Sequence, residues 1–139
     1  MKPGTAILLA MSACCITASA FSQEPTVKTI YFETNSFTIN SENKVQLDEI
    51  GRKCVTDTLA YLKIFAYADT SGTVKHNNKL SAKRSLAVYN YLVKTFQLDP
   101  SKIYRTWLGE EIDGAYDLHF PAAHLQQRCV DVVVSFKKH

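Results

Sequence analysis

The chain has 139 residues, of which 46% are hydrophobic and 21% charged, a composition typical of a folded globular protein. This length fits one domain with a sizeable core and is too short for two. The formal net charge is +3, and the basic residues are scattered along the chain. Nucleic-acid-binding and membrane-surface proteins usually concentrate their basic residues, so we expect no nucleic acid among the partners.

The N-terminal segment has the features of a secretory signal peptide. Lys2 precedes an uncharged run over residues 6–20, which ends in an A-S-A sequence. This run is shorter than the ~20 residues that cross a bilayer, so we expect no transmembrane segment in the mature chain. A retained membrane anchor and lipid attachment at Cys14, which follows a sequence similar to a lipoprotein processing site, remain open alternatives. The predicted organisation is a signal peptide at residues 1–20, a lead-in segment at 21–26 and a folded domain at 27–139.

The first half of this domain predicts a strand, a helix and a second strand. Residues 27–32 are β-branched and aromatic, which is typical of a strand. Asn40 or Ser41 is suited to capping the helix that follows. Residues 61–67 are apolar on both sides, which favours a central strand. A strand-helix-strand unit indicates parallel pairing of its two strands. The apolar face of the helix comprises Leu47, Ile50 and Cys54.

The second half predicts a helix over residues 75–96, ended by Pro100, and two further strands at 103–108 and 130–136. The loop between these strands covers residues 109–127. The order β-α-β-α-β-β predicts an α+β two-layer sandwich, with a mixed sheet and both helices on one face. We assign the tyrosines and Trp107 to the core. Cys54 and Cys129 are expected on opposite faces of the sheet, which disfavours a disulfide without excluding one.

The stretch at residues 66–92 carries the strongest candidate site. Asp69 follows the second strand, and Asn77, Ser81 and Arg84 share one face of the helix. That face is apolar, and a buried guanidinium requires a carboxylate or a ligand anion as its partner. An acid at a strand end, facing an amide and a guanidinium, can hold a small zwitterion. The alternative, in which Asp69 caps a turn and Arg84 lies on a solvated face, is equally open.

These residues resemble the OmpA-like domain, a peptidoglycan-binding module. The family pattern D-x-x-G-x4-N-x2-L-S-x2-R matches residues 69–84 without a gap, and further matches lie at residues 31–35, 109–110 and 128–130. The resemblance implies non-catalytic binding of the diaminopimelate residue of the peptidoglycan stem peptide. Asp69 would bind its ammonium group and Arg84 its carboxylate, with Asn35, Asn77 and Arg128 lining the same pocket.

The resemblance also implies a periplasmic location, and it leaves association with the outer membrane open. Outer-membrane or other envelope proteins are candidate partners besides peptidoglycan. We expect no enzyme, because His76 near Asp69 lacks an accompanying nucleophile. We expect no metal and no cofactor, because His119, His124 and the cysteines lack the close spacing of zinc ligands. The sequence departs from the family at Ala66 and Ala68, where a glycine and a hydroxyl residue are usual. A protein-interaction module that keeps the fold without binding peptidoglycan is the alternative function.

Overall fold

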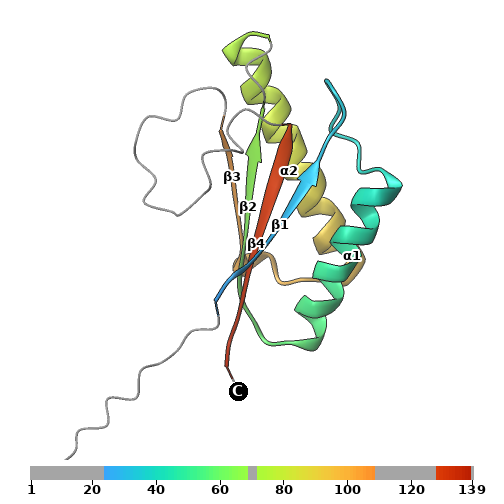
Figure 1. Ribbon diagram of the computed structural model, residues 1–139. Helices are drawn as coiled ribbons and strands as arrows, with labels where there is room; N and C mark the ends of the chain where they lie inside the picture. The colour runs from blue at the N-terminus through green and yellow to red at the C-terminus, as the bar shows by residue number, and fades with distance from the viewer. Residues whose placement is uncertain (1–23, 69–71, 109–127, 139) are drawn as a thin grey trace, which may run out of the picture.

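The computed structural model describes residues 24–68, 72–108 and 128–138. The order of elements confirms the predicted β-α-β-α-β-β arrangement (Figure 1). Cys14, the predicted signal peptide, Asp69 and the loop at residues 109–127 lie outside the described residues. The elements are β1 (Thr26–Tyr31), α1 (Ser41–Thr56), β2 (Leu59–Tyr67), α2 (Val74–Phe96), the short 3-10 helix η1 (Pro100–Lys102), β3 (Ile103–Leu108) and β4 (Cys129–Phe136).

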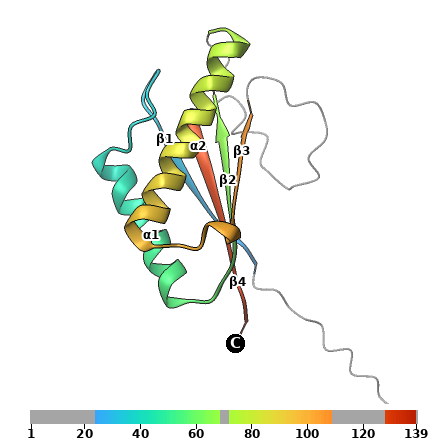
Figure 2. The ribbon, with the colours of Figure 1, turned by 180° about the vertical axis from the view of Figure 1, so that it is seen from behind.

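The described residues form two layers, with α1 and α2 on the same face of the sheet (Figures 1 and 2). This confirms the predicted α+β sandwich. The predicted apolar face of α1 is buried, and Val88 and Leu92 of α2 are fully buried. Between helices and sheet, the core is formed by aliphatic side chains from every strand and both helices.

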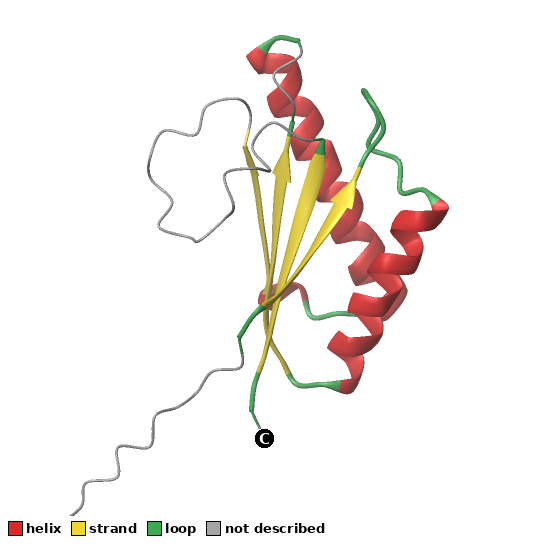
Figure 3. Ribbon diagram, in the orientation of Figure 1, coloured by secondary structure: helices red, strands yellow, loops and turns green. Residues whose placement is uncertain are grey.

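The sheet order β1-β4-β2-β3 corrects one prediction (Figure 3). β1 and β2 run in the same direction but are not hydrogen-bonded, because β4 lies between them and is antiparallel to both. The parallel pair is β2 with β3. All eight residues of β4 are buried, so an interior position in the sheet removes the most apolar surface from water.

Each of the two long helices begins after a polar residue whose side chain caps it. Asn40 caps α1, as predicted, and its side chain accepts a hydrogen bond of 2.8 Å from the backbone N–H of Asn43. Thr73 caps α2 and accepts from the N–H of His76 at 3.2 Å. Gly72 precedes this cap with a φ of +105°, a conformation that only glycine adopts easily. The described residues contain no helix long and apolar enough to cross a membrane.

Trp107 is 44% exposed, so its assignment to the core is wrong. It lies on β3, which is an edge strand of the sheet. Tyr31 and Tyr104, also on edge strands, are exposed as well, whereas Tyr67 on the central β2 is buried. Cys54 and Cys129 are not joined to each other by a disulfide, in agreement with the expectation that they lie on opposite faces. Cys54 packs in the core under the helices, and Cys129 packs on the other face.

Candidate ligand-binding site

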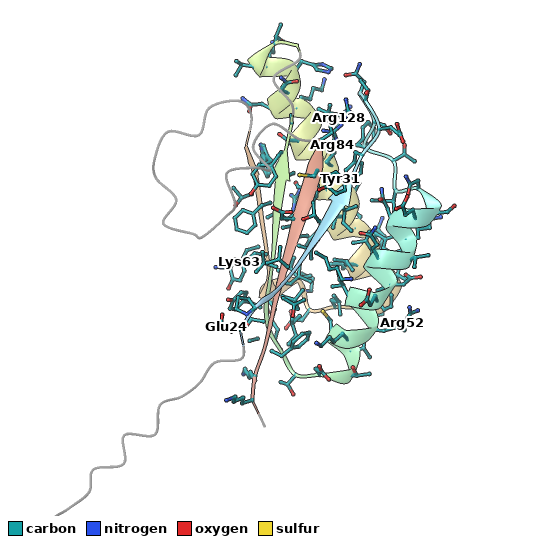
Figure 4. All side chains as sticks on the ribbon, viewed as in Figure 1. Glu24, Tyr31, Arg52, Lys63, Arg84 and Arg128 are labelled. Carbon is teal, nitrogen blue, oxygen red and sulfur yellow. The ribbon has the colours of Figure 1, made fainter. Side chains whose placement is uncertain are left out.

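Four of the five predicted site residues lie at one end of the sheet, which we call the loop end; the fifth, Asp69, is outside the described residues. β1 and β2 finish there and β4 begins there, because Tyr31 pairs with Cys129 and Ala66 with Val130. The loop after β1, the residues before α2 and the residue before β4 therefore all emerge at this end. Figure 4 shows Arg84 and Arg128 at the loop end and Glu24 toward the opposite end.

Arg84 is the largest fully buried side chain of the described residues, with 0% of its surface exposed. The alternative in which it lies on a solvated helix face is therefore wrong. Its Nε donates to the carbonyl of Ser36 at 2.9 Å and its Nη2 to that of Glu33 at 3.1 Å. Its Nη1 donates to the carbonyl of Tyr67 at 3.3 Å. The sequence pattern predicts a carboxylate or a ligand anion as the partner of Arg84 and does not reveal these backbone carbonyls.

These three hydrogen bonds tie the loop after β1 to the end of β2. The guanidinium also lies over the ring of Phe32, 5.4 Å from its centroid. Hydrogen bonds from a charged donor contribute about 1.5–3 kcal/mol each, more than bonds between neutral groups. Arg84 thus holds Asn35, which lies between two of the three acceptor residues, at the loop end of the sheet.

Asn35 lies on this loop, and Asn77 lies on α2 next to His76, the residue that Asn35 contacts. Asn35 has a φ of +53°, in the left-handed region that Asn tolerates better than most residues. Its Oδ1 lies 3.2 Å from Nε2 of His76, within hydrogen-bond distance. Asn77 is 1% exposed, and a Cβ at Gly72 would lie 3.4 Å from its Oδ1. His76 is not among the predicted ligand-binding residues, although its position next to Asn77 in the sequence indicates that it lies near them.

Arg128 is exposed and lies immediately before β4. Its carbonyl accepts a hydrogen bond of 2.8 Å from the N–H of Phe32, which places it beside the end of β1. The structure therefore brings Arg128, Asn35, Asn77 and Arg84 to the same end of the sheet. The position of Asp69 relative to Arg84 lies outside the described residues, and their pairing stays a prediction.

Tyr67 and Cys129 are buried near the loop end, on the face of the sheet that the helices do not cover. Neither group is suited to nucleophilic chemistry. Burial, and then the charge of Asp131, raise the pKa of the Tyr67 hydroxyl well above its usual range. Burial also raises the pKa of the Cys129 thiol to about 12, although Arg84 acts in the opposite direction. Both groups remain protonated at neutral pH. Within the described ranges, no group of three or more His, Cys, Asp or Glu residues is placed to hold a metal ion.

A sequence profile of the OmpA family matches residues 31–119. The chain belongs to the OmpA family. This match contains Asn35, Asp69, Asn77 and Arg84 and ends before Arg128. A search of curated proteins gives no match.

Several solved structures share this fold at low sequence identity. The OmpA-like domain of FopA1 from Francisella tularensis is 20% identical, with a TM-score of 0.62 over 99% of this chain and 97% of that chain. The peptidoglycan-associated lipoprotein from Burkholderia pseudomallei is 21% identical, with a TM-score of 0.56 over 76% and 88% of the two chains. The cell wall anchor of the T6SS from Pseudomonas aeruginosa is 18% identical, with a TM-score of 0.61 over 82% and 83%.

Proposed function

We propose that this OmpA-family chain binds peptidoglycan without catalysis, through the diaminopimelate residue of the stem peptide, and so tethers or organises the cell envelope. The observation that carries the proposal is the convergence of Asn35, Asn77, Arg84 and Arg128 at the loop end, from the loop after β1, from α2 and from the residue before β4. Two proteins of the same fold, described as a peptidoglycan-associated lipoprotein and a cell wall anchor, support it. The proposed location is the periplasm, reached by way of the predicted signal peptide.

In this proposal Asp69 binds the ammonium group of diaminopimelate and Arg84 its carboxylate, while Asn35, Asn77 and Arg128 flank the ligand. Arginine suits the carboxylate because its planar fork of N–H donors matches the two oxygens. The hydrogen bonds to the carbonyls of Ser36, Glu33 and Tyr67 fix the guanidinium in advance, which lowers the entropy cost of binding. Because Arg84 is fully buried in this structure, a ligand contact requires a displacement of the residues that cover it.

The burial of Arg84 also favours a second candidate function. A guanidinium that donates to three carbonyls of its own chain serves as a structural clamp without any ligand. Under this alternative the chain is a protein-interaction module of the envelope that keeps the fold and does not bind peptidoglycan. The two candidates differ in the ligand contact expected of Asp69, which only the peptidoglycan-binding function includes.

The test compares binding to purified diaminopimelate-type and lysine-type peptidoglycan. Lysine lacks the second carboxylate, so we expect the wild-type chain to prefer the diaminopimelate type. Truncating one partner of a desolvated charge pair costs about 2–5 kcal/mol, so Asp69→Ala is expected to weaken binding by ~30-fold to several-thousandfold. Asp57→Ala, which removes the same charge between α1 and β2, is the matched control and is expected to bind as the wild type does. Equal binding of both polymers, or of wild type and Asp69→Ala, would reject the site.

A further inference from the structure

The charges of α2 are all of one sign. The helix spans 23 residues and contains no Asp or Glu, whereas α1 mixes acidic and basic residues. Lys75, Lys79 and Lys83 follow one another at i, i+4 and i+8, so they lie on one face of the helix over about 12 Å. All three are exposed, on the side opposite the buried face that carries Arg84. We call these three residues the lysine ridge.

Among the described residues, no acidic side chain forms an ion pair with the lysine ridge. The ion pair between Lys28 and Glu49 joins β1 to α1, away from α2. Like charges at i and i+4 destabilise a helix by about 0.2–0.5 kcal/mol per pair, so the ridge weakens the helix that carries it. The three positive charges make this surface complementary to an anionic partner, although they cost the helix some stability.

The lysine ridge adjoins the loop that carries Asn35. Nζ of Lys83 lies 4.8 Å from the ring centroid of Phe37, which is 42% exposed. The same loop contacts α2 through Asn35 at His76 and through its carbonyls at Arg84. Through this loop, Lys83 of the ridge and the exposed Asn35 of the proposed diaminopimelate site lie on neighbouring parts of the surface.

We propose that the lysine ridge binds the carboxylates of stem peptides next to the one held at the diaminopimelate site. This inference rests on the proposed function. Stem peptides repeat along a glycan strand, so the polymer presents several anionic groups where a single stem peptide presents only its own. Once one stem is bound, its neighbours are at high effective concentration, and weak exposed contacts then add to the affinity.

An anionic membrane fits the lysine ridge less well. Helices that lie on a bilayer bury a broad apolar face in the lipid. The apolar face of α2, including Val88 and Leu92, is already buried against the sheet. The polymer is therefore the partner that the charge and the position of the ridge support.

The test uses the full chain with the triple substitution Lys75→Gln, Lys79→Gln and Lys83→Gln. The matched control removes three other exposed charges through Lys44→Gln, Arg52→Gln and Lys94→Gln. Affinity is measured for diaminopimelate-type sacculi and for a single diaminopimelate-containing stem peptide, at low salt and at 0.5 M salt. Circular dichroism checks that both variants are folded.

We expect the ridge variant to bind sacculi about threefold to hundredfold more weakly than the wild type, from three exposed contacts of ordinary strength. Its affinity for the single stem peptide is expected to stay within about twofold of wild type. High salt is expected to remove the difference on sacculi, because it screens exposed charges. The control variant is expected to match the wild type on both ligands.

An unchanged affinity of the ridge variant for sacculi, with wild-type binding intact, overturns this inference and leaves the proposed function standing. An equal loss on the single stem peptide also overturns it, because the ridge would then belong to the first site. Ridge-dependent binding to vesicles of anionic phospholipid, without an effect on sacculi, would assign the ridge to a membrane. A wild-type chain that binds neither ligand overturns the proposed function and this inference together.

Discussion

The burial of Arg84 leads to a prediction about stability that is separate from its proposed role in binding. Arg84→Ala removes the donor to the carbonyls of Glu33, Ser36 and Tyr67 and the contact with Phe32. The bond to Tyr67 is buried, and a buried acceptor left without a donor costs about 1–3 kcal/mol. The other two bonds are partly buried, so water replaces the guanidinium there at lower cost.

With a further ~0.5–1 kcal/mol for each of these two bonds, we expect Arg84→Ala to lower the free energy of unfolding by about 2–5 kcal/mol. This is a large fraction of the ~5–15 kcal/mol that stabilises a typical domain. The measurement is urea unfolding followed by circular dichroism, with the midpoint and the slope both fitted. Arg52→Ala, which removes an exposed arginine from α1, is the control and is expected to change stability by less than about 0.5 kcal/mol.

Arg84→Lys separates the charge from the geometry of the guanidinium. Lysine keeps the positive charge, but its ammonium group is compact. It cannot donate to all three carbonyls at once, as the planar guanidinium of arginine does. We therefore expect Arg84→Lys to recover only part of the lost stability. An unfolding free energy of Arg84→Ala equal to that of the wild type would refute the clamp, and full recovery by Arg84→Lys would refute its geometric basis.

Two further predictions concern the core. A Cβ at Gly51 would lie 2.2 Å from ring atoms of Phe96, so Gly51→Ala is expected to force α1 and α2 apart. Overpacking of this kind costs about 1–3 kcal/mol of stability, less the ~1 kcal/mol that alanine gains over glycine in a helix. Thermal unfolding measures the net loss, and a gain in stability would contradict the close contact. Burial raises the pKa of Cys54 to about 11 and of Cys129 to about 12, from 9.0. Ionisation of the thiols therefore favours the unfolded chain as pH rises above about 9. Under reducing conditions, the unfolding free energy should fall toward pH 11, and it should fall less steeply with pH in the double Cys→Ala variant. An equally steep fall in both proteins would show that the thiols are not the cause.

The sequence predicted the local parts of the fold and missed the order of the strands. Asn40 was identifiable as a helix cap because its acceptor and the N–H it binds lie three residues apart. The pairing of β1 with β2 was wrong because it depends on β4, a strand about 100 residues later in the chain. The apolar residues on both sides of β4 were a signal for an interior strand. Trp107 was misplaced for the same reason, since the pattern of β3 does not show that it is an edge strand.

The candidate site was predictable as a set of residues and not as a set of contacts. The spacing of Asn77 and Arg84 placed both on the buried face of α2, which the structure confirms. The acceptors of Arg84 were not predictable, because every residue carries a backbone carbonyl and none is marked in the sequence. Only the fold determines that the carbonyls of Ser36 and Glu33 point toward α2.

The loop after β1 links the proposed binding site to the lysine ridge, and this gives Arg84 two separable effects. Asn35 and Phe37 lie on the loop whose carbonyls Arg84 holds, and they contact His76 and Lys83. Releasing the loop by Arg84→Ala should therefore weaken both parts of the surface and lower stability. Asp69→Ala removes a proposed ligand contact alone, so it should weaken binding without a loss of stability. If Asp69→Ala lost stability as well as binding, as Arg84→Ala is expected to do, Asp69 would also support the fold.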